Sequence, residues 1–143
     1  MPHIANIPIV FLVERDDEHR SAMAEGLRSD GMNVSEFTRS AEALTSLSNG
    51  GRPAVVVVTP EGDGVTDGEL AWAAKANSPQ TNIVFTHRPS GATLPPGTHV
   101  LTTPFAPDRL SRFIRLVVAK PALRSTLQAL YRRARSSGVR AVI

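Results

Sequence analysis

The stretch Ala54-Val55-Val56-Val57-Val58-Thr59 decides the fold, because it holds five apolar residues in a row before its first polar one. An unbroken run of this kind, rich in β-branched side chains, is typical of a strand that is buried on both faces of a parallel sheet. Open α/β sheets bind their ligands in the crevice at the carboxyl ends of their strands. Thr59 is therefore the first candidate site residue.

Four more segments have the composition of strands, and helix signals separate them. The strand segments are 7–13, 32–37, 82–86 and 98–102. Acidic residues in its first turn favour a helix over 16–30, with Gly31 as its left-handed cap. Ser40 is expected to cap a second helix. The spacing Thr66-x-x-Glu is that of a capping box and predicts a third helix that begins at Asp67.

The chain after residue 86 departs from this regular alternation. Segment 87–97 contains three prolines and two glycines and has no apolar period, which predicts a loop. A further helix is expected to start with Pro107 in its first turn. Its apolar face is formed by Leu110, Phe113, Ile114, Val117 and Val118. Strands that alternate with helices imply right-handed βαβ units and a parallel sheet.

Charge divides the 143 residues into an acidic body and a basic tail. Residues 1–100 carry 7 basic and 12 acidic side chains, whereas residues 101–143 carry 9 basic and one acidic. We expect one domain over 1–120 and a basic amphipathic helical extension over 121–143, which Pro121 separates from the preceding helix. The extension combines an apolar stripe with arginines, and its candidate interaction residues are Leu123, Leu127, Leu130, Tyr131, Arg132 and Arg133.

Composition argues against several classes of site. The chain has no cysteine, which removes disulfides, thiolate metal sites and a cysteine nucleophile. Its four histidines are scattered without ligand-like spacing, so we expect no metal and no cofactor. No nucleophile–base pair is visible, so we do not expect an enzyme. Since there is neither a signal peptide nor an apolar run of ~20 residues to span a bilayer, the sequence predicts a cytoplasmic protein.

From about residue 7 to residue 118, the sequence resembles the receiver domain of two-component response regulators. The first strand is followed by an acidic residue, Glu14, and Gly31 falls sixteen residues after Arg15. Arg52-Pro53 leads into the run 54–58, and Phe85-Thr86 ends the next strand. Thr103-Pro104-Phe105 stands where the family has Lys-Pro-Phe. The resemblance implies an α/β fold with a doubly wound, five-stranded parallel sheet of flavodoxin-like topology.

The resemblance also implies a chemistry, which is phosphoryl transfer in a phosphorelay from a histidine kinase to an aspartate, helped by magnesium. By position, Thr59 stands for the acceptor aspartate, and Glu14 and Arg15 stand for the acid pair that holds the metal. Thr103 stands for a lysine that neutralises the phosphoryl oxygens, and Thr86 for a hydroxyl that binds the product. Only Glu14 and Thr86 keep the family's residue type. The resemblance thus points to a pseudo-receiver with a degenerate phosphorylation pocket.

Physical chemistry makes these departures severe. Magnesium prefers anionic oxygen ligands, so the guanidinium of Arg15 would repel it. A neutral threonine hydroxyl with no activating base is a poor phosphoryl acceptor. A shifted register that uses Asp16 and Asp17 as the acid pair would still leave Thr59 and Thr103 in place.

Arg15 and Thr86 each leave two interpretations open. Arg15 pairs with a carboxylate, either Glu14 or Glu61, or it points to solvent. Thr86 responds to an occupied pocket, as in the family, or it satisfies backbone groups at the end of its strand. The family's mobile aromatic residue corresponds to Val100, and a loop replaces the fourth helix. The elements that transmit phosphorylation in the family are therefore expected to be missing.

These features favour a signalling adaptor that binds a protein partner or a second copy of itself without phosphorylation. The alternative is that the basic extension binds nucleic acid or an acidic surface, although Tyr131 is its only aromatic residue. A third hypothesis is an enzyme or small-molecule sensor that uses the loop Glu61-Gly62-Asp63-Gly64, whose acidity would repel phosphates. The fold by itself does not decide among these functions. Whether the chain is part of a larger regulator also stays open.

Overall fold

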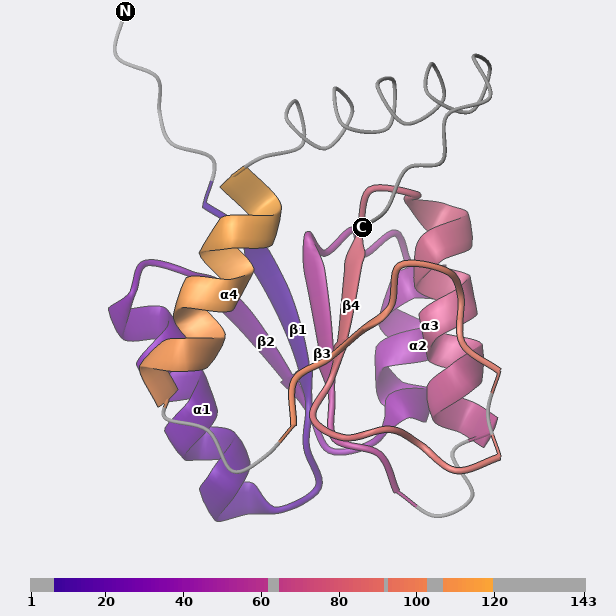
Figure 1. Cartoon of the computed structure of the whole chain (residues 1–143), viewed down its shortest axis with the longest axis horizontal. Helices are drawn as coiled ribbons and strands as arrows, with labels where there is room; N and C mark the ends of the chain where they lie inside the picture. The colour runs from indigo at the N-terminus through magenta and orange to yellow at the C-terminus, as the bar shows by residue number, and fades with distance from the viewer. Residues whose placement is uncertain (1–6, 62–64, 92, 103–106, 120–143) are drawn as a thin grey trace, which may run out of the picture.

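A computed structural model describes residues 7–61, 65–91, 93–102 and 107–119 (Figure 1). Its five strands form one parallel sheet in the order β2-β1-β3-β4-β5. The strands are β1 (Ile9–Val13), β2 (Asn33–Phe37), β3 (Val55–Val58), β4 (Asn82–Phe85) and β5 (His99–Val100). The last strand is shorter than the predicted 98–102. The parallel sheet follows from the apolar runs of β1, β3 and β4, which are buried on both faces.

Helices cover both faces of the sheet, as a doubly wound fold requires. They are α1 (Asp17–Ser29), α2 (Ser40–Ser48), α3 (Val65–Asn77) and α4 (Pro107–Ala119). Helices α1 and α4 contact each other on one face, and α2 and α3 contact each other on the other (Figure 1). The predicted α/β class, the parallel five-stranded sheet and the receiver topology are confirmed. The predicted extension over 121–143 lies outside the described residues.

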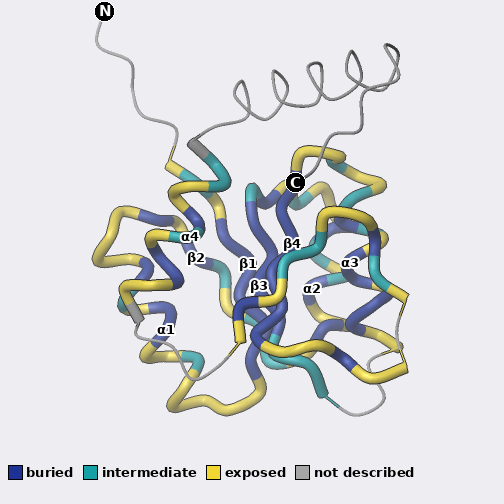
Figure 2. The backbone as a smooth tube through the Cα atoms, in the orientation of Figure 1, coloured by how far each residue is buried: buried dark blue, intermediate teal, exposed yellow. Residues whose placement is uncertain are grey.

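Each face of the sheet has its own hydrophobic core. Val55 and Val57 of β3 belong to the cluster under α1 and α4, whereas Val56 and Val58 belong to the cluster under α2 and α3. All four valines are fully buried, so the central strands form a dark blue layer between the helices (Figure 2). This alternation confirms the interpretation of run 54–58 as a strand buried on both sides.

Helix α1 begins and ends as predicted. The Asp16 carboxylate accepts a hydrogen bond from the backbone N–H of His19 at 2.9 Å and so caps the helix. Gly31, at a φ of 86°, follows the C-cap Asp30. The left-handed conformation explains why glycine stands there. Helix α4 also begins as predicted, and Leu110 and Ile114 of its apolar face are buried.

The predicted starts of α2 and α3 are wrong by one and two residues. Arg39 is the N-cap of α2, and Ser40 is its first helical residue. Helix α3 starts at Val65, two residues before the predicted Asp67. The side chains of Ser40 and Asp67 both turn inward, and the Ser40 hydroxyl donates to Asp67 Oδ1 at 2.5 Å. Ser40 thus makes a tertiary hydrogen bond in place of the capping bond that was predicted for it.

The segment between β4 and β5 contains no helix in its described residues, as the loop prediction required. In Figure 1 it passes beside α3, where the indole Nε1 of Trp72 donates to the Thr93 carbonyl at 2.8 Å. Pro89 and Pro95 are buried, and Leu94 packs against the core under α2 and α3. The loop thus covers the part of the sheet next to α3.

In the part of the chain that the structure describes, no helix is both long enough and apolar enough to cross a lipid bilayer.

The turn after α2 allows a sharp stability prediction. A Cβ on Gly51 would lie 2.8 Å from Phe11 Cζ and 2.9 Å from the backbone carbonyl oxygen of Ser46, so Gly51→Ala must shift the turn away from both atoms. We expect Gly51→Ala to lower the free energy of unfolding by about 1–3 kcal/mol, measured by urea denaturation. Ser48→Ala, at an exposed position of the same helix, is the control and should change it by less than about 0.5 kcal/mol. An unchanged midpoint for Gly51→Ala would contradict the packing described here.

Candidate functional site

The candidate site lies at the carboxyl ends of β1, β3 and β4. Val13 is in register with Val58, and Val58 with Phe85, so the residues that follow these strands lie at one level. Those residues are Glu14, Thr59 and Thr86. Strand pairing thus brings together three of the five predicted pocket residues. Arg15 lies next to Glu14, and Thr103 lies outside the described residues.

Thr59 and Thr86 form a pair of neutral hydroxyls. Thr86 Oγ1 donates to Thr59 Oγ1 at 3.2 Å, and Thr86 is 1% exposed. Their backbone N–H groups continue the sheet ladder, donating to Val13 O from Thr59 and to Val58 O from Thr86, both at 3.0 Å. The Thr86 hydroxyl therefore bonds to the residue at the acceptor position instead of to a backbone group.

Arg15 forms an ion pair with Glu61, which selects one of the interpretations left open by the sequence. Arg15 Nη1 lies 2.7 Å from Glu61 Oε1, while 68% of the arginine side chain remains exposed. An exposed pair of this kind contributes at most about 1 kcal/mol to stability. Its consequence is electrostatic, because a guanidinium occupies this edge of the sheet and the Glu61 carboxylate is already paired with it.

Glu14 is buried and pairs with a histidine that the sequence analysis did not single out. Its side chain Oε1 lies 2.5 Å from His19 Nδ1, and the histidine side chain is half exposed. Arg20 donates from Nη1 to the Glu14 carbonyl at 2.9 Å. Glu14 precedes α1 and His19 lies in its first turn, so the contact depends on how the chain turns into the helix. A helical i,i+4 pattern therefore does not reveal it.

The neighbouring acids Asp16 and Asp17 are engaged elsewhere. Asp16 caps α1, and Asp17 Oδ1 accepts from Arg20 Nη2 at 2.7 Å. This hydrogen bond raises the pKa of the Arg20 guanidinium above its usual value. Arg20 also contacts Glu36 of β2. Asp16 and Asp17, the acid pair of the shifted register, therefore both have structural partners at the start of α1.

The described part of this edge offers little to a cation. Among the described residues, no group of three or more histidine, cysteine, aspartate or glutamate side chains could hold a metal ion. The carboxylate of Glu14, which is buried at the end of β1, has a histidine partner. A hollow of about 800 Å³ lined by described residues lies at the amino ends of the strands and does not belong to this site.

Comparison with known proteins supports the fold. No family model matches the sequence, and no curated protein matches it either. Among solved structures, the chain is similar to the response regulator receiver domain protein from Clostridium thermocellum, with a TM-score of 0.66 and 14% identity over 82% of this chain and 98% of that one. It is also similar to a response regulator receiver protein from Sinorhizobium medicae, with a TM-score of 0.65 and 19% identity over 80% and 97%.

A third similar structure is the receiver domain of a sensor histidine kinase from Pseudomonas aeruginosa, which has a magnesium ion coordinated in its active-site cleft. The TM-score is 0.65 and the identity 17%, over 80% of this chain and 99% of that one. At these identities the comparisons show that the chain has the receiver fold.

Proposed function

We propose that this chain is a pseudo-receiver, a signalling adaptor of the two-component type that acts by protein–protein interaction and without phosphorylation. The observation that carries the proposal is the hydrogen bond between Thr59 and Thr86, at the place where a receiver would present its acceptor carboxylate. A hydroxyl bonded to another hydroxyl has no base to remove its proton, so it is a poor nucleophile.

Electrostatics supports the same proposal. Magnesium keeps a nearly octahedral shell of oxygen ligands and favours carboxylates. At this edge the Arg15 guanidinium is fixed by Glu61, and Glu14 faces His19. A cation would have to displace one of these partners and also approach a positive charge, so binding is disfavoured.

The adaptor needs a surface for its partner, and the strongest candidate in the sequence is the apolar stripe of the extension. The stripe consists of Leu123, Leu127, Leu130 and Tyr131, with Arg132 and Arg133 beside it. We propose that another protein or a second copy of this chain takes this stripe, with the arginines contributing orientation and association rate. These residues lie outside the described part of the chain, so this assignment rests on the sequence.

The proposal predicts that the chain does not respond to a phosphoryl donor. Acetyl phosphate with magnesium should add no phosphoryl group, as measured by intact mass, because the acceptor position carries a hydroxyl without a base. The amide NMR signals of Glu14, Thr59 and Thr86 should keep their positions during a magnesium titration.

A receiver domain that carries the acceptor aspartate, treated in parallel, is the positive control. An aspartyl-phosphate adduct on this chain, or saturable magnesium-dependent shifts at the three residues, would contradict the proposal. Salt-dependent binding of DNA by the extension would instead favour the nucleic-acid hypothesis.

A further inference from the structure

We propose that the groove at the amino ends of the strands is the docking site for the chain's own C-terminal segment, residues 121–143. In the isolated protein the stripe of Leu123, Leu127, Leu130 and Tyr131 rests in this groove. The inference concerns the resting place of the stripe. Docking in the groove does not require the proposed adaptor function. Only the further point, that a partner protein competes with the groove for the stripe, rests on that function.

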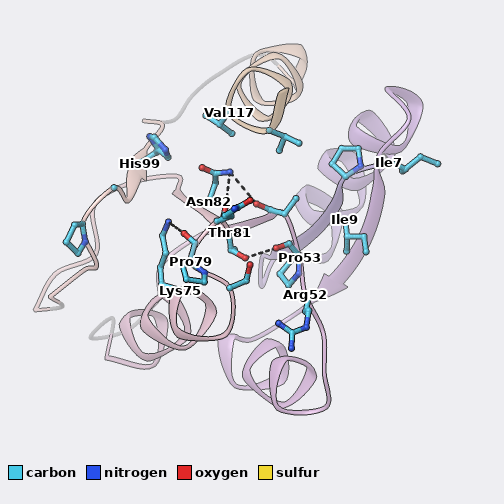
Figure 3. A pocket seen from close by; sticks show the side chains of 17 residues that line it. Ile7, Ile9, Arg52, Pro53, Lys75, Pro79, Thr81, Asn82, His99 and Val117 are labelled. Carbon is cyan, nitrogen blue, oxygen red and sulfur yellow. Dashed lines mark hydrogen bonds between the residues drawn. The ribbon is translucent and has the colours of Figure 1, made fainter. Parts of the chain in front are cut away.

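The groove is a large hollow with an apolar wall. Its volume is about 800 Å³, and it lies between the start of β1, the start of β3, the end of α3 and the end of α4. Figure 3 shows Ile7 and Ile9 on one side of it and Val117 on another. Ile7 is 63% exposed and Ile9 is 39% exposed, so the described residues leave two large apolar side chains uncovered at the rim.

Polar groups at the base of the groove already have partners within the fold. The Thr81 hydroxyl donates to the Pro53 carbonyl at 2.8 Å, and Asn82 Nδ2 lies 3.5 Å from the carbonyls of Ala54 and Gln80. Arg52 donates to the carbonyl of Asn77 at 3.1 Å. Among the described residues, the buried side-chain atom without a partner is Ser111 Oγ, which is not in the groove. The exposed isoleucines and the valines of α4 are therefore the part of the lining that suits apolar side chains.

The position of α4 favours the chain's own segment as occupant. Val117 and Val118 line the groove, and α4 ends at Ala119. The chain therefore leaves the described fold at the rim of the groove, and 24 residues of sequence follow. Pro121 cannot extend α4 without losing a hydrogen bond, so a change of direction is favoured there. A tethered segment has an effective concentration in the millimolar range, far above that of a second copy at micromolar protein.

Charge sets the orientation of the docked segment. The described residues that line the groove include Arg52 and Lys75 but no aspartate or glutamate. Arginines of the segment would meet like charges there, so docking favours the orientation in which the apolar stripe faces the groove. At 100° per residue, Ser125 lies on the face opposite the stripe. Docking therefore leaves the arginines toward solvent and hides the apolar residues that a partner would bind.

The absence of cysteine makes a crosslinking test direct. The test variant combines Ile7→Cys with Leu127→Cys, and the matched control combines Ile7→Cys with Ser125→Cys. Both full-length variants are treated with a short bis-maleimide at micromolar concentration, and products are separated under denaturing conditions and identified by mass. Unchanged circular dichroism confirms that both variants fold.

We expect the Leu127 variant to give an internally crosslinked monomer at least tenfold faster than the Ser125 variant. Equal rates for the two variants would overturn the inference, because the stripe would then have no preference for the groove. Crosslinked dimers as the main product would also overturn it and would assign the groove to a second copy. Neither result would affect the proposal that the chain acts without phosphorylation, which the phosphoryl-donor experiment tests separately.

Discussion

Thr59→Asp alone is expected to leave the chain without a phosphoryl group after treatment with acetyl phosphate and magnesium. The substitution supplies the missing nucleophile at the end of β3, but it adds a carboxylate to an edge where Arg15 supplies a positive charge. The guanidinium can pair with the new carboxylate, as it does with Glu61 at 2.7 Å, and so compete with the metal. Intact mass should therefore stay that of the unmodified variant.

Removing Arg15 as well should change the result. The double variant Arg15→Asp/Thr59→Asp places two carboxylates beside Glu14, and we expect it to bind magnesium at least tenfold more tightly than the natural chain, measured by calorimetry. Arg15→Asp/Thr59→Asn is the matched control, because it keeps the shape at residue 59 without its charge. Phosphoryl uptake by Thr59→Asp alone, or equal magnesium affinity of Thr59→Asp and the double variant, would show that Arg15 does not block the site. Equal affinity of the double variant and its control would show that the carboxylate at residue 59 is not a ligand.

Asp67→Ala is expected to lower the free energy of unfolding by about 3 kcal/mol, because it removes two hydrogen bonds to a buried carboxylate. Asp67 Oδ1 accepts from the Ser40 hydroxyl, and Oδ2 accepts from the backbone N–H of Glu61 at 3.1 Å. The substitution leaves both donors without partners and loosens the loop that carries the partner of Arg15. Urea denaturation measures the loss.

Ser40→Ala is the matched comparison for Asp67→Ala. It removes one of the two donors and leaves the hydrogen bond to Glu61 intact, so we expect a smaller loss of about 1 kcal/mol. The double variant should lose less than the sum of the two single losses, because Ser40 and Asp67 contact each other. Additive losses would show that the hydrogen bond between them contributes little to stability.

Strand positions were predictable because burial on both faces leaves a simple mark in the sequence. Local composition alone was enough to predict a strand at the run 54–58 and at the runs before Glu14 and Thr86. The resemblance to the receiver domain grouped Glu14, Thr59 and Thr86, and parallel pairing places the ends of their strands at one level. Their proposed role as a degenerate pocket stays a prediction.

The errors arose where a side chain bonds to a distant residue. Ser40 and Asp67 are separated by 27 positions, and the hydrogen bond between them turns Ser40 away from the capping role that the local pattern suggested. The pair of Glu14 and His19 depends on the turn between β1 and α1, for which the sequence has no periodic signal. Local rules describe isolated helices, whereas these residues are placed by packing between elements.

The anchor of the loop between β4 and β5 has a consequence for sequence divergence. Trp72, the only tryptophan of the chain, donates to the main-chain oxygen of Thr93, and the Thr93 side chain is exposed. Every amino acid supplies such an oxygen, so position 93 is free to mutate while the anchor persists. Position 72 has less freedom, because a side chain without a donor, such as phenylalanine or leucine, would lose the anchor. Homologues should therefore drift at 93 and be constrained at 72.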